Sequence, residues 1–156
     1  MKFESYKVTP GANIDLDKWS TLPTREESEV DFEEEIQKNI EKMDDLQKAL
    51  YGESKQSLLV IFQGIDAAGK DSTIRAVFSG INPAGISVTS FKKPSQEELS
   101  HDYLWRHVKA LPRRGEIAIF NRSHYENVLI TKVHPELILF ENLPGIESVS
   151  DIGEDL

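Results

Sequence analysis

The chain has 156 residues, of which 38% are hydrophobic and 29% are charged, a composition typical of a soluble protein with one sizeable core. It contains no cysteine, which excludes disulfides and thiolate metal sites. No apolar run approaches the roughly 20 residues of a membrane span, and the N-terminus lacks a signal-peptide core. These features favour a cytoplasmic protein that is not bound to a membrane.

The net charge of −9 is unevenly distributed. Residues 64–132 hold ten Lys or Arg against seven Asp or Glu, whereas the remainder holds eight against twenty. A basic surplus in the middle of the chain fits an anionic ligand there, although solubilising surface charges explain the same numbers. The overall acidity argues against nucleic-acid binding.

In chain order, residues 1–25 predict an irregular segment and residues 26–52 predict one amphipathic helix that Gly52 ends. The helix is expected because apolar residues recur every three or four positions and form one stripe. The stripe consists of Phe32, Ile36, Ile40, Met43, Leu46 and Leu50.

Residues 53–156 alternate short apolar runs with helical patterns and predict one further domain. The expected strands are 58–63, 86–91 and 116–120, and the expected helices are 70–79, 94–109, 123–132 and 135–142. The first and third strands are continuously apolar, as in a parallel sheet that is buried on both faces. The alternation predicts an α/β fold, in which ligands bind at the carboxyl ends of the strands.

The first strand is followed by the most informative motif of the chain, in which Gly64 precedes Gly69-Lys70 by the spacing G-x-x-x-x-G-K. This spacing is typical of a phosphate-binding loop. Small residues let backbone N–H groups converge on phosphate oxygens, and the following helix and the lysine add positive charge. The motif departs from the common pattern at Asp71, where most such loops carry Ser or Thr to hold Mg²⁺.

Asp66 is unusual because a carboxylate inside a phosphate-binding loop repels its ligand. Mg²⁺ held between Asp66 and phosphate oxygens would explain the residue. Activation of an attacking phosphate, orientation of Lys70 and a carboxylate that caps its own turn are the alternatives.

The third strand is followed by Asn121, Arg122 and, one helical turn later, Glu126. Asn121 stands where many phosphate-loop enzymes place an Asp for Mg²⁺, and Arg122 has the geometry to clamp a phosphate. Glu126 either leans into the same cleft or simply pairs with Arg122. On the preceding helix, Arg106 either reaches a substrate phosphate or pairs with Asp102.

With these residues in place, the chain resembles the polyphosphate kinase 2 family. The resemblance rests on four blocks taken together: Gly64–Ile74, Tyr103–Arg106, Leu111–Ile117 and Phe120–Glu126. It implies a P-loop kinase-like three-layer α/β/α fold with a parallel sheet, incomplete at its C-terminus. It also implies transfer of phosphoryl groups between inorganic polyphosphate and nucleotides such as AMP, ADP and ATP, with Mg²⁺. Asn121 resembles the branch that phosphorylates both nucleoside mono- and diphosphates.

The same resemblance implies the roles of the site residues. Asp66, Lys70, Arg122 and Glu126 are expected to be catalytic, Asp66 and Glu126 to hold metal, and Arg106, Asn121 and Arg122 to bind the nucleotide. The phosphate-binding residues are expected to be Gly64, Ala67, Ala68, Gly69, Lys70, Asp71 and Ser72.

Family members continue for roughly another hundred residues, with a basic lid helix and further strands. The chain is therefore expected to be the N-terminal portion of a longer enzyme that self-associates, and to turn over weakly or not at all by itself. Two alternatives remain: an ATP-dependent kinase of nucleotides or small molecules, and a truncated, inactive anion-binding module.

Overall fold

The computed structural model describes residues 7–19, 22 and 31–152. The chain falls into two compact units, which divide between Lys38 and Asn39, inside helix α1 (Phe32–Glu53). In the first unit, Pro10 and Gly11 form a turn, with Ala12 donating to the carbonyl of Thr9 at 3.1 Å. The short 3-10 helix η2 (Leu16–Lys18) follows.

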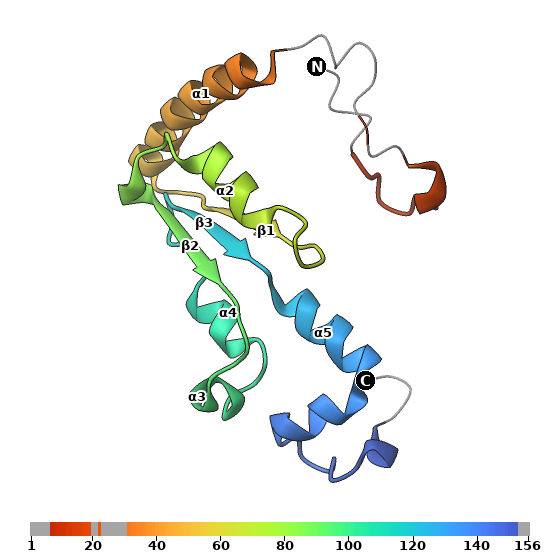
Figure 1. Ribbon diagram of the computed structural model, residues 1–156. Helices are drawn as coiled ribbons and strands as arrows, with labels where there is room; N and C mark the ends of the chain where they lie inside the picture. The colour runs from red at the N-terminus through yellow and green to blue at the C-terminus, as the bar shows by residue number, and fades with distance from the viewer. Residues whose placement is uncertain (1–6, 20–21, 23–30, 153–156) are drawn as a thin grey trace. The chain divides into compact units, whose positions relative to one another are not determined.

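The second unit is built on a three-stranded parallel sheet in the order β1-β3-β2, drawn as arrows in Figure 1. Its strands are β1 (Leu58–Phe62), β2 (Ile86–Ser90) and β3 (Ile117–Asn121). Phe62 and Ser90 both stand opposite Asn121, so the carboxyl ends of all three strands are level. The segments after the strands therefore meet at one edge, as the parallel α/β fold predicts.

Among the described residues after β1, the four predicted helices correspond to α2, α3, α4, α5 and η5, and the short 3-10 helices η4 and η6 were not predicted. The α-helices are α2 (Lys70–Phe78), α3 (Gln96–Leu99), α4 (Trp105–Lys109) and α5 (His124–Val133). The 3-10 helices are η4 (Pro83–Gly85), η5 (Pro135–Glu141) and η6 (Val149–Asp151). The segment 135–142, predicted as a helix, is thus 3-10 in character and one residue shorter.

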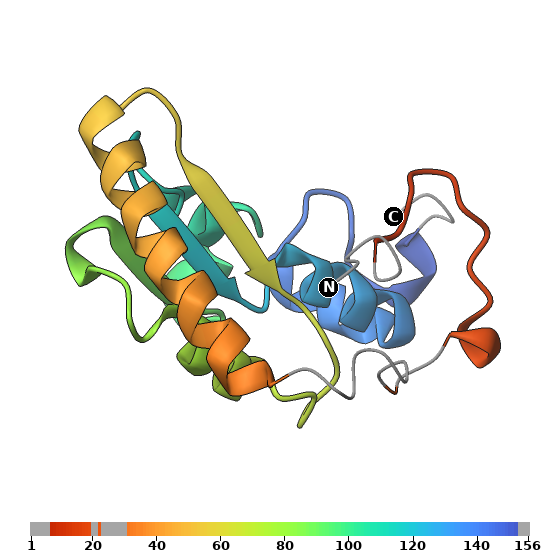
Figure 2. The ribbon, with the colours of Figure 1, turned by 90° about the horizontal axis from the view of Figure 1, so that it is seen from above.

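Central strand β3 divides the core into two layers, because its side chains alternate between the faces of the sheet. On one face, Ile117 and Ile119 form a cluster with Ile74 of α2. On the other face, Ala118 and Phe120 form a cluster with Phe91. Figure 2 shows the part of α1 that belongs to the second unit, residues 39–53, on one face of the sheet and α4 on the other, which gives the expected helix–sheet–helix layers.

Three further sequence predictions were wrong in detail. The helix predicted over 94–109 is interrupted between α3 and α4, where the carboxylate of Asp102 accepts from the N–H of Leu104 and its carbonyl accepts from Trp105, which forms a turn before α4 begins. Strand β1 is only partly buried, since it is an edge of the sheet in the described part of the chain. Helix α1 continues through Gly52 to Glu53, where Ser54 adopts a positive φ of 52°.

The buried face of α1 also differs from the predicted stripe. Leu46 is exposed, whereas Gln47 is only 2% exposed and Ile40 is buried. Close packing against Gly85 explains this, because a Cβ at that glycine would lie 1.8 Å from the Gln47 amide nitrogen. The start predicted at residue 26 lies outside the described residues; the described helix begins at Phe32, capped by the Asp31 carboxylate.

Candidate active site

The loop between β1 and α2 has the backbone of a phosphate-binding loop. Ala67 and Gly69 have positive φ of 63° and 83°, which turns the chain sharply into the helix. Gly69 is the N-cap of α2 and provides no side-chain cap, so the first N–H groups of the helix are left for another acceptor. An anion at the positive end of the helix satisfies them.

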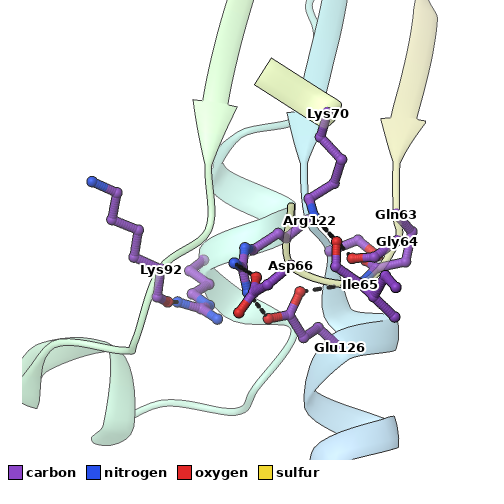
Figure 3. Close-up of polar contacts among 10 residues, drawn as sticks. Gln63, Gly64, Ile65, Asp66, Lys70, Lys92, Arg122 and Glu126 are labelled. Atoms are coloured by element: carbon purple, nitrogen blue, oxygen red, sulfur yellow. Dashed lines mark hydrogen bonds and ion pairs between the residues drawn. The ribbon is translucent and has the colours of Figure 1, made fainter. Parts of the chain in front are cut away.

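Lys70, the first residue of α2, folds back over the start of the loop. Its Nζ donates to the carbonyls of Gly64 and Ile65, both at 2.9 Å (Figure 3). The hydroxyl of Ser72 donates to the carbonyl of Gly69 at 2.8 Å. The ammonium is therefore held beside the loop that it is expected to serve, within reach of a ligand bound there.

Arg122 joins the loop to α5. Its backbone N–H donates to the carbonyl of Phe62 at 2.9 Å, and its φ of 70° turns the chain away from β3. Its guanidinium donates to Asp66 through one nitrogen and to Glu126 through another (Figure 3). The bond to Glu126 is the main cause that raises the pKa of Arg122 above its ordinary value. Arg122 thus stays charged between two carboxylates.

Asn121, the last residue of β3, forms a second link to the loop. Its side-chain amide donates to the carboxylate of Asp71, and only 7% of the residue is exposed. The other amide atom, Oδ1, is buried and has no hydrogen-bond partner among the described residues. A buried oxygen without a partner, next to a carboxylate, can accept a hydrogen bond from a ligand or coordinate a cation.

Two cavities meet at Arg122, Phe91, Lys92 and Lys93, which line both. The first has a volume of about 930 Å³ and is lined by the phosphate-binding loop from Asp66 to Ser72 and by Asn121. The second has a volume of about 560 Å³. Its lining combines Arg106 and Glu126 with apolar side chains: Pro94, Leu99, Ile130, Leu137 and Phe140.

The structure separates the predicted residues into two groups. Asp66, Ala67, Ala68, Gly69, Lys70, Asp71, Ser72, Asn121 and Arg122 line the first cavity, with Gly64 behind it as an acceptor for Lys70. Glu126 and Arg106 line only the second cavity. Glu126 pairs with Arg122, which was one of its two alternatives. Asp66 also accepts from Arg122, so it does more than cap its own turn.

Arg106 does not pair with Asp102. Instead it donates to the carbonyl of Lys92 at 2.8 Å, lies 3.9 Å from the carboxylate of Glu98 and covers the ring of Phe91 at 5.4 Å. These contacts tie α4 to the segment after β2. Arg106 therefore helps to shape the wall of the second cavity.

Lys92 and Lys93 were missed as site residues, although both contributed to the basic surplus of residues 64–132. Both side chains are exposed and line both cavities. They follow β2, so the rule that ligands bind at the carboxyl ends of parallel strands was the signal that could have found them.

The oxygen ligands around the loop fit Mg²⁺. Within the described residues no three His, Cys, Asp or Glu side chains gather as a metal cage. Mg²⁺ bound with phosphates needs no such cage, because it takes one or two carboxylates and fills its other positions with substrate oxygens and water. Asp66, whose side chain is 85% exposed, offers a carboxylate to the first cavity, and Asn121 Oδ1 offers a neutral oxygen.

Glu126 fits less well as a second ligand. It lines the other cavity, and both of its carboxylate oxygens already accept hydrogen bonds, one from Arg122 and one from Gln63. Asp66 and Glu126 are thus brought together by their ion pairs with Arg122 and not by a vacant metal position between them.

None of the described helices has the length and apolarity that crossing a membrane requires.

The chain is similar to known proteins over most of its length. Residues 25–141 match the family model of polyphosphate kinase 2. An ADP-polyphosphate phosphotransferase of Rhodopseudomonas palustris is 46% identical over 149 residues, which are 95% of this chain and 52% of the relative. An AMP/ADP-polyphosphate phosphotransferase of Meiothermus ruber is 42% identical over 135 residues, which are 83% of this chain and 49% of the relative.

The fold agrees with these sequence matches. The crystal structure of polyphosphate kinase 2 from Arthrobacter aurescens TC1 superposes with a TM-score of 0.75 at 33% identity, covering 89% of this chain and 51% of that chain. The predicted P-loop kinase-like α/β fold is therefore confirmed. The chain spans about half the length of the relatives it matches. On the family match and these relatives, the chain belongs to the polyphosphate kinase 2 family.

Proposed function

We propose that this chain carries the phosphate-binding half of a polyphosphate:nucleotide phosphotransferase, which moves phosphoryl groups between inorganic polyphosphate and AMP, ADP or other nucleoside mono- and diphosphates. The observation that carries the proposal is the pair of cavities that meet at Arg122, Lys92 and Lys93. A transfer between two phosphorylated substrates needs two binding spaces that share a cationic boundary. The names of the relatives support polyphosphate as one substrate and a nucleotide as the other.

The first cavity suits the polyphosphate. Its lining combines the N-terminus of α2 with Lys70, and Arg75 adds a further cation. The second cavity suits the nucleotide, because its apolar walls can hold a nucleoside while Arg122 faces the phosphates. In this arrangement the acceptor phosphate and the last phosphoryl group of the polyphosphate meet beside the Arg122 guanidinium.

The reaction follows from this placement. An oxygen of the acceptor phosphate attacks the terminal phosphorus of the polyphosphate, a new P–O bond forms, and the bridging P–O bond breaks on the opposite side. The electron pair of the broken bond leaves with the shortened polyphosphate. Lys70 and Arg122 counter the charge that accumulates on the transferred group and on the leaving oxygen. Mg²⁺, bound by Asp66 with phosphate oxygens, would supply further charge neutralisation.

The test is a donor comparison with the full polypeptide as encoded and with the 156-residue chain. Each is incubated with AMP or ADP, Mg²⁺ and either polyphosphate or ATP as the donor, and the products are followed by ³¹P NMR. We expect transfer from polyphosphate, and a Lys70→Ala variant with about 100-fold or greater loss of kcat. Lys42→Ala, an exposed lysine of α1, is the matched control.

Two results would replace the proposal. Transfer from ATP with none from polyphosphate would indicate an ATP-dependent kinase. Binding of polyphosphate without any Lys70-dependent transfer in the full polypeptide would indicate an anion-binding module. Transfer by the full polypeptide but not by the 156-residue chain supports the proposal and assigns the missing requirement to residues outside this chain.

A further inference from the structure

Gln63 directly follows β1 and precedes the phosphate-binding loop, and its side chain reaches residues at the start of α5. Its Oε1 accepts a hydrogen bond from the hydroxyl of Ser123 at 3.1 Å. Its Nε2 donates to Oε2 of Glu126 at 3.2 Å (Figure 3). One neutral side chain therefore contacts both the N-cap of α5 and the carboxylate one turn into that helix.

The partners determine which way the Gln63 amide points. The carboxylate of Glu126 pairs with the Arg122 guanidinium and has only acceptor oxygens, so it faces the NH₂ group of the glutamine. Ser123 is only 1% exposed, and its oxygen accepts from the backbone N–H of Tyr125 at 3.3 Å. Its hydroxyl hydrogen is therefore free to donate to the Gln63 carbonyl. Rotating the amide by half a turn would lose the bond to Glu126 and set the Gln63 carbonyl against that carboxylate.

These bonds form one continuous connection. It runs from buried Ser123 through Gln63 to Glu126, from there to Arg122, and on to Asp66 in the loop. Gln63 holds one oxygen of Glu126, which leaves the other directed at the guanidinium. Without that bond the Glu126 side chain could rotate away from Arg122, and the guanidinium would keep only its contact with Asp66.

We propose that Gln63 is a positioning residue: it orients the Glu126 carboxylate and thereby fixes the Arg122 guanidinium at the boundary of the two cavities. The effect of Gln63 on turnover rests on the proposed function, whereas the hydrogen-bonded connection itself does not. The chemistry is specific to glutamine, because Met has a similar length but neither bond, and Glu would set a second carboxylate against Glu126.

The kinetic test uses the full polypeptide as encoded and a double-mutant cycle. We expect Gln63→Met to lower kcat about 10- to 100-fold while KM for polyphosphate changes less than about twofold, since the geometry of Arg122 is lost but the cations remain. In a Glu126→Gln background the same substitution should add almost nothing, because Gln63 acts through Glu126. Gln37→Met, an exposed glutamine of α1, is the matched control.

Additive losses in the cycle, or a Gln63→Met enzyme with wild-type kcat, would overturn the proposal. A purely structural role would lower the unfolding temperature and leave the two substitutions additive, so thermal unfolding of each variant accompanies the kinetics.

A second measurement does not depend on turnover. The side-chain amide signals of Gln63 in ¹⁵N NMR spectra, assigned by their loss in Gln63→Met, should move in Glu126→Ala and stay in place in Glu41→Ala, an exposed glutamate of α1. Unmoved signals would overturn the inference even in an active enzyme. Moved signals in a protein without phosphoryl transfer would retain the connection and reject the proposed function.

Discussion

Arg122 links the end of β3 and the first turn of α5 to a distant part of the sequence, the loop at Asp66. Asp66, Arg122 and Glu126 were each predicted from the sequence, because the G-x-x-x-x-G-K spacing and the strand-end position are local signals. The sequence could not identify the contact between Arg122 and Asp66, since 56 positions separate the two residues. That contact depends on the parallel pairing of β1 with β3, which places the two segments side by side.

Asn121 provides a test of the oxygen ligands in the first cavity. Asn121→Asp would replace a hydrogen bond to Asp71 by two adjacent carboxylates at a site that is 7% exposed. We expect the free energy of unfolding in urea to fall by about 1–3 kcal/mol without Mg²⁺. Millimolar Mg²⁺ should restore most of that loss, because a cation between the carboxylates removes their repulsion.

Gln37→Glu is the matched control, because it adds the same charge on the exposed surface of α1. Equal recovery of both variants in Mg²⁺ would show a general salt effect and contradict a cation site at Asp71 and Asn121.

The helices that cover the sheet were predicted better than their boundaries. Periodicity correctly placed α2 and α5, and Ser123 caps α5 as expected, accepting from the N–H of Tyr125. Periodicity failed between α3 and α4, where one helix was predicted over 94–109, but Asp102 forms a turn by accepting from the N–H groups of Leu104 and Trp105. An aspartate in a turn and an aspartate inside a helix look alike in a sequence, so periodicity alone could not place this break.

The contact between α1 and the start of β2 depends on a glycine. Gly85→Ala would place a Cβ 1.8 Å from the amide of buried Gln47 and 3.3 Å from the ring of Tyr51. We expect the free energy of unfolding to fall by about 1–3 kcal/mol, because the buried glutamine must move. Gly52→Ala is the control: it lies in α1 with open space around it and should stabilise by about 0.5–1 kcal/mol. Equal effects of the two substitutions in urea unfolding would contradict this packing.

Helix α4 should make the stability depend on pH through His107. This histidine is 5% exposed, packs on Phe91 with ring centroids 4.2 Å apart, and faces Arg106, His124 and Glu98. Burial is the main cause that lowers the pKa of His107 below 6.5. The unfolded chain therefore binds the proton first, so the stability is complete above about pH 6.5 and falls as the pH drops.

We expect a loss of at most about 1.4 kcal/mol per pH unit from His107 between pH 6.5 and 5. His107→Phe should flatten this slope, and the exposed His134→Gln should not. Three carboxyl groups have lowered pKa values: Asp44, Glu98 and Asp151. Their contribution to the stability is lost only at lower pH, below about 4. Urea unfolding at pH 7, 6 and 5 measures the slopes, and equal slopes for wild type and His107→Phe would contradict the assignment.

Over the whole molecule, the family, the parallel sheet and the phosphate-binding loop followed from the sequence, because each has a pattern that does not depend on distant contacts. The two cavities did not, because their walls combine the segments after β1, β2 and β3 with η5. The prediction that β1 is buried on both faces was also wrong, since a continuous apolar run indicates a strand but not its place in the sheet.

Helix α5 carries an apolar stripe on its outer side that should govern association. Tyr125, Val128, Leu129 and Val133 are 60%, 48%, 63% and 65% exposed, and their spacing places them along one side of the helix. Exposed apolar stripes of this kind bind other apolar surfaces. We expect the 156-residue chain to associate as its concentration rises, and the double substitution Leu129→Glu and Val133→Glu to shift it toward monomer in sedimentation experiments. Lys42→Glu changes the net charge by the same amount on α1; if it dissociated the chain equally well, charge repulsion and not the stripe would control association.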